Sequence, residues 1–501
     1  MIPQVVWFKR DFRMTDHAPL ADAASEGPVI ALVIVEPAYW AGADVSARQW
    51  SVLSGAIEAL RESLAALGVP LQVAFDEAIP TLAFCLARLG SFVLRSHEET
   101  GNAWTWRRDR AVSSWCRENG IPWQQSRQFG VWRGRDLNRD RWADRWDRLM
   151  RQSVRAVPQT LQAGPALFGG RLPAASELGL APDGWAGGLA MGREAALARL
   201  DSFLHERGER YTREMSSPVT AETACSRLSQ DLALGTVSMR EVTQIAWARM
   251  RDLADAPDGA SWRQSLRSFT GRLHWHCHFI QKLDAEPEAE SRPFARAYEG
   301  LRPRPGRADR LEAWARGCTG YPFLDAAMRY LNATGWINFR MRAMLMSFAA
   351  YDLWLPWQEA GLHLARQFVD YEPGIHWPQC QMQAGETGIN TVRIYSPVKQ
   401  GRDQDPDGDF VRRWVPELAR VPGAIVHEPW RLVPGDRARL CPAYPAPIVD
   451  HLQAAAAAKT AIFGLRRKPD ARAEADAVQR KHGSRRRRAP PRTPPSQGEL
   501  F

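Results

Sequence analysis

The sequence predicts two folded parts of different class, a doubly wound α/β domain followed by an all-α domain. A chain of 501 residues is longer than one hydrophobic core usually accommodates, so more than one domain is expected. In the first hundred residues, short apolar runs alternate with helical patterns, as in a parallel sheet covered by helices. From Gly192 onward the apolar spacing is helical. The expected parts are an α/β domain at 1–150, a connector at 151–190, a helical domain at 191–465 and a tail at 466–501.

The N-terminal pattern begins with two continuous apolar runs that lack the polar alternation of a half-exposed strand. Such runs indicate parallel strands buried on both faces. Farther along, Trp50, Leu53 and Ile57 recur at spacings of three and four, which predicts a helix. The predicted strands lie at 4–8, 28–35, 71–75 and 92–94, and the predicted helices at 46–67 and 79–89.

Two segments lack the patterns of a packed element. Residues 151–190 contain many prolines and glycines, so we interpret them as the connector between the domains. The tail at 466–501 is rich in alanine, proline and arginine and includes four consecutive arginines at 485–488. We expect the tail to be disordered, because it offers little apolar surface for burial.

Composition narrows the class of partner and the compartment. The formal net charge of +10 favours a polyanionic partner, and the part of the chain before the tail keeps a basic excess, so nucleic acid is a candidate. The seven cysteines form no Cys-x-x-Cys pair, as expected of reduced thiols. No signal peptide and no apolar run of about 18 residues is visible, so we expect a cytoplasmic protein without a membrane partner. We also expect a monomer.

The stretch from 314 to 418 is rich in aromatic residues and arginine. Apolar side chains recur at helical spacing in 325–332 and in 340–353, so both segments are predicted to be helices with one buried face. Arg340 and Arg342 are two residues apart and therefore point in different directions. Asp370 is a suitable partner for one of them. Taken alone, this pattern is that of an ordinary structural ion pair.

Two shorter patterns have more than one interpretation. Ser226 and Ser229 precede an apolar run, where hydroxyl groups can either cap a helix or bind a phosphate. His274 and His278 lie one helical turn apart, as metal ligands can. No third ligand stands at a companion spacing, so we expect no metal site.

Several strings taken together resemble the FAD-binding catalytic half of the cryptochrome/photolyase family. They are TGYPFLDAAMR at 319–329, TGWINFRMR at 334–342, RIYSP at 393–397 and FVRRWVPEL at 410–418. The opening WFKRDFRMTD at 7–16 resembles the start of the family's antenna-type domain. The resemblance covers roughly residues 4–450. It implies a Rossmann-like antenna-type domain followed by an all-α FAD-binding domain, with no iron–sulfur cluster because Cys318, Cys380 and Cys441 are one ligand short.

The resemblance also implies a set of cofactor-binding residues. The matching positions are Tyr211, Cys225, Ser226, Arg227, Leu228, Ser229, Arg272, Trp336, Arg340, Arg342, Asp370 and Glu372. Cys225 replaces the hydroxyl residue usual in the family's diphosphate loop, which removes one hydrogen bond. Arg342 and Asp370 would lie beside the isoalloxazine ring, where the guanidinium favours a reduced anionic flavin.

The resemblance is weaker at two other places. Folate-binding members carry an acidic residue where this chain has Thr105, between Trp104 and Trp106, so we doubt a folate antenna, and packing is the alternative role for these tryptophans. Cyclobutane-dimer photolyases hold the lesion with residues that are replaced here by Ser268, Gly271 and Phe339. The second chromophore and the type of lesion therefore stay open.

The family's catalytic positions suggest how a bound flavin would be reduced. Trp357 matches the middle member of the family's tryptophan chain, Trp377 the inner member, and either His376 or Trp377 would face flavin N5. Relatives have a solvent-exposed tryptophan as the outer member of this chain, and the matching position here is Arg304. Trp354, one helical turn from Trp357, is the candidate to replace that outer tryptophan. Packing in the core is the alternative role for these tryptophans.

Three functions follow from these observations. The first is blue-light-driven, FAD-dependent repair of UV-induced pyrimidine photoproducts in DNA by electron transfer, which the basic body and the catalytic-half motifs favour. The second is a cryptochrome-type photoreceptor that signals through flavin photoreduction, which the altered lesion positions favour. The third is a flavoprotein without photochemistry. Light-dependent repair of irradiated oligonucleotides distinguishes the first from the others.

Overall fold

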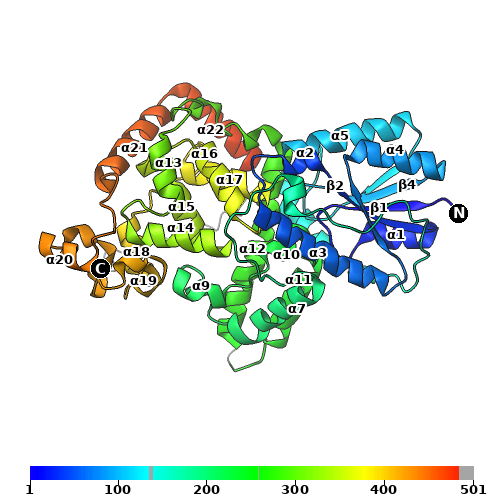
Figure 1. The fold of residues 1–501 in the computed structure, drawn as a ribbon, viewed down its shortest axis with the longest axis horizontal. Coiled ribbons are helices and arrows are strands. Elements are labelled where there is room, and N and C mark those ends of the chain that lie inside the picture. Colours follow the sequence, from blue (N-terminus) through cyan, green and yellow to red (C-terminus); the bar gives the residue numbers. More distant parts are fainter. Residues whose placement is uncertain (135–138, 258, 484–501) are drawn as a thin grey trace.

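The computed structural model describes residues 1–134, 139–257 and 259–483, and Figure 1 shows them as two parts. An α/β part built on a parallel sheet occupies one end, and a larger helical part occupies the other (Figure 1). The two classes match the predicted fold. Within the described residues, no helix combines the length and apolar character that a membrane crossing requires.

The sheet has five parallel strands in the order β3-β2-β1-β4-β5. They are β1 Gln4–Phe8, β2 Val29–Val35, β3 Leu71–Phe75, β4 Val93–His97 and β5 Trp123–Ser126. Every residue of β1 and β2 is buried, which confirms the interpretation of the two continuous apolar runs. The sequence analysis missed β5, because this edge strand exposes two glutamines and has no apolar pattern.

Helices cover both faces of the sheet. Residues of α1 (Ala18–Glu26) and α3 (Ala47–Ala65) share one apolar core with alternate residues of β1 and β2. Residues of α4 (Ala78–Leu89) and α5 (Ala103–Glu118) pack with the intervening residues of the same strands. The short helix α2 (Pro37–Trp40) follows β2 at the edge that faces the helical part (Figure 1).

The helical part contains one long helix, α12 (Gly259–Ala285), and α17 (Pro373–Ala384) packs against it. Its other helices are α6 Trp142–Met150, α7 Arg193–Ser202, α8 Tyr211–Glu214, α9 Pro218–Ala224, α10 Ser229–Leu234, α11 Met239–Asp252, α13 Ala308–Ala315, α14 Pro322–Thr334, α15 Phe339–Ser347, α16 Trp357–Gln367, α17 Pro373–Ala384, α18 Pro397–Gln404, α19 Asp409–Trp414, α20 Pro434–Leu440, α21 His451–Arg466 and α22 Pro469–His482. The helices predicted at 325–332 and 340–353 are α14 and α15, and a turn of π-helix at Phe348–Asp352 continues α15.

Residues on either side of the expected boundary at residue 150 pack against a different part of the molecule from the one to which the sequence analysis assigned them. Trp142, Trp146 and Met150 of α6 are buried in the same core as α11 and α12 of the helical part. The segment 151–190 lies against the α/β part, where Ala163 pairs with Val29 of β2. Apolar residues of this segment, among them Leu172, cover the core beside α3.

The predicted disorder of the tail is wrong for residues 469–482, which form α22. Ala471 and Val478 are buried, and the imidazole of His482 pairs with Glu286 at 2.9 Å. An alanine-rich segment has high helix propensity, so two buried apolar side chains and polar anchors are enough to hold it. Residues 484–501, with the run of four arginines, lie outside the described residues.

Candidate functional site

The segment between α9 and α10 contains four of the predicted cofactor-binding residues, and a fifth begins α10. Leu228 is buried, and Ser229 is the first residue of α10. Arg227 has a φ of +58°, a left-handed conformation that is uncommon for a residue with a side chain. Its guanidinium carbon lies 3.9 Å from the centre of the Trp336 ring. The turn therefore brings Arg227 and Trp336 together, although they are far apart in the sequence.

Four arginines surround Cys225. Burial raises the pKa of the Cys225 thiol to about 11, although the charges of Arg207, Arg227, Arg272 and Arg342 act in the opposite direction. The thiol is therefore neutral at pH 7. Four guanidinium groups around one neutral side chain favour an anionic ligand with several oxygen atoms.

Arg207 was missed by the sequence analysis. Its guanidinium donates to the carbonyl oxygens of Thr223 at 2.8 Å and Ser226 at 2.9 Å, and also contacts the Cys225 carbonyl. It thus determines the shape of the loop that precedes α10. Arg207 ends a turn of π-helix at Phe203–Arg207, and no local pattern in the sequence indicates that its side chain reaches a loop beyond α9.

The predicted residues on α8 and α12 lie at the same cluster. Burial raises the pKa of the Tyr211 hydroxyl to about 12, although the nearby charge of Arg272 acts in the opposite direction. The guanidinium of Arg272 lies 5.8 Å from the ring of Phe339, which is 49% exposed. Arg272 and Phe339 thus connect the buried cluster with the surface.

Arg342 and Asp370 form the ion pair that the sequence suggested. Arg342 Nη2 donates to Asp370 Oδ2 at 2.7 Å, and the carboxylate side chain is 1% exposed. The Arg342 guanidinium also lies 4.1 Å from the ring of Phe368. Arg340 points elsewhere and contacts Gln400 Oε1 at 3.4 Å, as expected for residues two apart on a helix.

Several buried polar atoms of these residues lack a hydrogen-bond partner within the described chain. They are Arg227 Nε, Ser229 Oγ, Arg340 Nε, Asp370 Oδ1 and Glu372 Oε1. Buried polar groups are normally paired, so donors and acceptors without partners at one site are available to a ligand. Together with the four arginines they fit the diphosphate and the polar ring edge of FAD.

The predicted redox residues are only partly brought together. The ring centres of Trp357 and Trp377 are 6.0 Å apart, and His376 lies 4.8 Å from Trp377. Burial lowers the pKa of His376 to about 4, and the nearby charges of Arg342 and Asp370 also act on it. The His376 ring lies 5.9 Å from the ring of Phe368, which also contacts Arg342.

Trp354 does not lie one helical turn from Trp357, so that prediction is wrong. The π-helical turn ends at Asp352, Trp354 has a φ of +55°, and α16 begins only at Trp357. The partly exposed Trp354 ring instead faces the guanidinium of Arg302 at 4.7 Å. Helical spacing does not relate the two tryptophans, because a proline-containing turn separates them.

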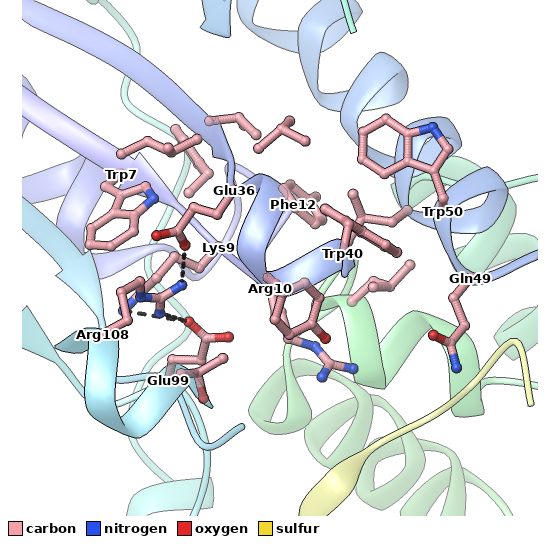
Figure 2. Close-up of a pocket in the computed structure, with 18 of the residues that line it drawn as sticks. Trp7, Lys9, Arg10, Phe12, Glu36, Trp40, Gln49, Trp50, Glu99 and Arg108 are labelled. Carbon is pink, nitrogen blue, oxygen red and sulfur yellow. Dashed lines mark hydrogen bonds and ion pairs between the residues drawn. The ribbon is translucent and has the colours of Figure 1, made fainter. Parts of the chain in front are cut away.

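A cavity of about 80 Å³ lies between the sheet edge and the helical part (Figure 2). Trp7, Glu36 and Trp50 of the α/β part line it, and Val369 and Tyr371 of the helical part complete its wall. Partial burial raises the pKa of Glu36 to about 7, against the opposing charge of Arg108. The sequence analysis did not single out this cavity, because its lining comes from strand ends that meet only in the fold.

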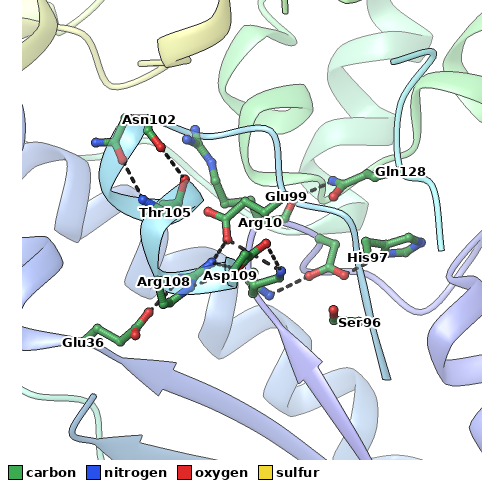
Figure 3. A network of polar contacts seen from close by, with 12 residues as sticks. Arg10, Glu36, Ser96, His97, Glu99, Asn102, Thr105, Arg108, Asp109 and Gln128 are labelled. Carbon is green, nitrogen blue, oxygen red and sulfur yellow. Dashed lines mark hydrogen bonds and ion pairs between the residues drawn. The ribbon is translucent and has the colours of Figure 1, made fainter. Parts of the chain in front are cut away.

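Ion pairs surround the cavity (Figure 3). Arg108 contacts Glu36 at 2.7 Å and Asp109 at 2.8 Å, and it also pairs with Glu99. Thr105 lines the cavity, and its hydroxyl donates to the Asn102 carbonyl at 2.9 Å. The acidic groups at this site are therefore Glu36 and Glu99, and both are engaged by Arg108.

The tryptophans near Thr105 have packing contacts. Trp104 lies 5.4 Å from the ring of Tyr39, and Trp106 faces the guanidinium of Arg133 at 5.0 Å. His274, considered as a metal ligand, packs 4.7 Å from the ring of Trp142. Each of these side chains therefore has an aromatic or guanidinium packing partner.

Asp11, His17 and His97 form a buried cluster at the ends of β1 and β4. Asp11 Oδ2 accepts hydrogen bonds from His17 at 2.9 Å and from His97 at 2.7 Å. Although burial raises it, these bonds hold the pKa of Asp11 well below its usual value. His17 Nδ1 accepts from the Leu20 N–H, so both ring nitrogens of His17 are hydrogen-bonded.

Comparison with known proteins identifies two matching family models. Residues 4–161 match the model described as DNA photolyase, and residues 269–463 match the FAD binding domain of DNA photolyase. A deoxyribodipyrimidine photo-lyase of Escherichia coli is 28% identical over 91% of this chain and 97% of its own length. The deoxyribodipyrimidine photo-lyase of Halobacterium salinarum is 30% identical over 90% of this chain and 96% of its own length. The crystal structure of a class III photolyase from Agrobacterium tumefaciens has a TM-score of 0.80 at 25% identity, over 93% of this chain and 98% of its own.

Proposed function

The chain belongs to the cryptochrome/photolyase family, and from that membership we propose that it is a blue-light-driven enzyme that uses FAD to repair pyrimidine photoproducts in DNA. The single observation that carries this proposal is the Arg342–Asp370 ion pair, which belongs to the residues that match a photolyase FAD domain and lies beside a cluster of arginines. Such an arrangement suits a ligand with both a diphosphate and a polar ring.

We assign the two ends of this site to the two halves of the cofactor. Arg227 and Arg272, with Ser229, would hold the diphosphate, because guanidinium and hydroxyl groups donate to phosphate oxygens. The N–H groups of Arg207 are bound within the chain, so Arg207 would act by holding the loop in place. Arg342 and Asp370 would lie at the isoalloxazine, where Asp370 Oδ1 is a buried acceptor that lacks a partner in the described chain. Trp336, stacked under Arg227, closes the site from one side.

When bound in its reduced form, FAD supplies an electron to the photoproduct under blue light and takes it back after the bond has split. The chain supplies position and charge. The Arg342 guanidinium favours a negatively charged ring, and the Asp370 carboxylate holds that guanidinium in place. Trp377 and Trp357 offer a path by which an external electron reaches the site.

The surface beside the cluster has features that suit DNA. Phe339 is 49% exposed and Trp275 of α12 is 43% exposed, so two aromatic rings are available for stacking with an extruded base. Arg272 joins Phe339 to the buried cluster. Positive charge near exposed aromatic rings is the usual arrangement for binding an unstacked nucleotide and its phosphates.

The proposal is tested with purified protein and irradiated oligonucleotides. We expect a yellow protein that carries FAD without a covalent bond and restores cyclobutane-dimer or (6-4) substrates only under blue light. Reactions in the dark and with Asp370→Ala protein are the controls. A protein that takes up no added FAD would overturn the assignment, and FAD-loaded protein that repairs neither substrate would remove the repair function.

The alternative, a photoreceptor of the cryptochrome type, is favoured by one observation. Apart from its own stretch of helix, a side-chain carbon added at Gly271 would meet no atom of the described residues within 4 Å, so this position on α12 leaves open space where cyclobutane-dimer photolyases carry an aromatic residue. Flavin photoreduction without repair of either substrate would support that function. We further propose that the protein acts as a cytoplasmic monomer, which size-exclusion chromatography and cell fractionation can test.

A further inference from the structure

The linker between α16 and α17 carries Asp370 and is held by side chains of the α/β part. It consists of residues 368–372, between the end of α16 at Gln367 and the start of α17 at Pro373. Phe368 contacts Arg342, and Asp370 binds it. Arg342 itself belongs to α15, so the position of this linker determines where Asp370 lies relative to it.

Three side chains from the start of α3 bind the last carbonyl groups of α16. Gln49 Nε2 donates to the Ala365 carbonyl at 2.7 Å and Ser46 Oγ to the Arg366 carbonyl at 2.8 Å. Arg48 Nη1 donates to the Gln367 carbonyl at 3.2 Å. The last carbonyls of a helix have no partner within the helix, so these bonds define where α16 ends and where the linker begins.

The other end of the linker is held in the same way. Arg10 Nη2 donates to the Tyr371 carbonyl at 2.7 Å, and the Tyr371 hydroxyl donates to Asp44 Oδ2 at 2.7 Å. Arg10 also lies 3.7 Å from Glu372. Asp370 thus stands between two attachments that both originate in the α/β part.

These attachments are rigid. The side chain of Arg48 is 1% exposed, and its Nε donates to Asp183 Oδ2 at 2.8 Å. This bond fixes the orientation of the guanidinium, whose Nη1 binds the Gln367 carbonyl. Within the linker, the Val369 amide donates to the Gly335 carbonyl at 3.0 Å. Figure 2 shows Arg10 and Gln49 at the cavity between the two parts, on the side of the helical elements.

We propose that Ser46, Arg48, Gln49 and Arg10 are positioning residues that set the place of Asp370 at the flavin. The α/β part is then a structural component of the redox site and not only a separate domain. This inference rests on the proposed function, because it takes the Arg342–Asp370 pair to be the flavin site. It predicts that changes on α3 alter the bound flavin, although none of these residues is among the predicted cofactor-binding residues.

The test compares Arg48→Met with Arg95→Met. Both arginines are buried in the α/β part, but Arg95 binds Gln4 Oε1 at 2.7 Å and lies on β4, away from the linker. In FAD-free protein we measure hydrogen exchange of the linker amides, with Val369 as the reporter. We expect exchange at least about tenfold faster in Arg48→Met than in Arg95→Met, since a lost hydrogen bond raises the frequency of local opening.

A second readout is the midpoint potential of the bound flavin. It should rise in Arg48→Met, because the negative charge of Asp370 moves away from the ring, and Arg48→Lys should restore part of the wild-type value. If Arg48→Met does not fold, the same two measurements are made on Gln49→Leu and Ser46→Ala. Each of these changes removes hydrogen bonds between uncharged groups at the end of α16. Linker exchange and potential equal to those of Arg95→Met would overturn the inference.

The two proposals fail in different ways. If the wild-type protein takes up no FAD, the proposed function fails, while the exchange comparison still shows whether α3 holds the linker. If the wild-type protein binds FAD and repairs DNA but the linker exchanges equally in both variants, only the positioning role is wrong.

Discussion

The ring of Trp357 lies 6.0 Å from the ring of Trp377, measured between their centres, and the two planes are inclined by 68°. Trp357 is fully buried at the start of α16, and Trp377 lies on α17 beside His376. Two aromatic rings at this separation can exchange an electron directly. The pair is thus a candidate path between the outside of the helical part and the flavin site.

We therefore expect Trp357→Phe to leave FAD content unchanged and to slow blue-light reduction of the flavin strongly in the presence of a thiol donor. The rate is followed by the loss of flavin absorbance during illumination. Trp314→Phe is the matched control, because Trp314 is also fully buried in the same core but packs against His363. Photoreduction of Trp357→Phe at the wild-type rate would show that the electron takes another path.

A second prediction concerns the ion pair. Asp370→Ala leaves the Arg342 guanidinium without its carboxylate, and hydrogen bonds to charged groups contribute about 1.5–3 kcal/mol. We expect weaker FAD binding, measured by fluorescence titration, and a higher midpoint potential. Asp370→Asn keeps an acceptor for Arg342 but removes the charge, so it separates the two effects. FAD affinity equal to wild type in Asp370→Ala would place the flavin elsewhere.

A third prediction concerns Cys225. Burial raises the pKa of its thiol to about 11, so at pH 7 the group is a neutral, weak donor among arginines. Cys225→Ser introduces a hydroxyl that can donate to a phosphate oxygen. One net hydrogen bond contributes about 0.5–1.5 kcal/mol, so we expect FAD to bind about 2- to 12-fold more tightly.

The control for this prediction is Ser229→Ala. Its hydroxyl is buried and has no protein partner in the part of the chain that the structure describes, so its removal should weaken FAD binding by a similar factor. Opposite effects of the two changes would place the diphosphate at the start of α10. If neither change altered the affinity, this loop would not contact the cofactor.

The strands of the α/β part could be predicted because each central strand is buried on both faces and therefore has a continuous apolar sequence. The different directions of Arg340 and Arg342 also followed from helical geometry alone. Both are local relationships, in which residues near in sequence determine the outcome. By contrast, β5 has a polar sequence, and it is a strand because its backbone pairs with that of β4.

The parts that could not be predicted depend on long-range contacts. Arg207 reaches a loop beyond α9, and Arg48 reaches the end of α16 from the other part of the molecule. A π-helical turn and a proline-containing turn displace Trp354 from the helix that its spacing suggested. No pattern within a window of the sequence encodes the contacts of Arg207 and Arg48. For Trp354 a local signal exists, because Pro356 stands between it and Trp357 and interrupts the helical spacing.

The last prediction concerns α22, which the sequence analysis treated as part of a disordered tail. Its Val478 is buried in the main helical core, and Lys481 and His482 both bind Glu286. A chain that ends at Gly483 keeps all of these contacts, so its FAD content and Tm should equal those of the full chain. A chain that ends at Asp470 loses them, and burial of one valine side chain alone contributes about 1.5–3 kcal/mol.

The attachment of α22 should also depend on pH. Although partial burial raises it, hydrogen bonds from His482 and Lys481 lower the pKa of Glu286 from 4.5 to about 2, while burial lowers the pKa of His482 below 6.5. Both groups bind fewer protons in the folded state than in the unfolded state, so their contribution is complete above pH 6.5. It decreases as the pH falls through 6.5 for His482, and then between 4.5 and about 2 for Glu286. Glu286→Gln should remove the lower part of this dependence in a Tm-versus-pH series, and a series identical to wild type would show that α22 is held by apolar contacts alone.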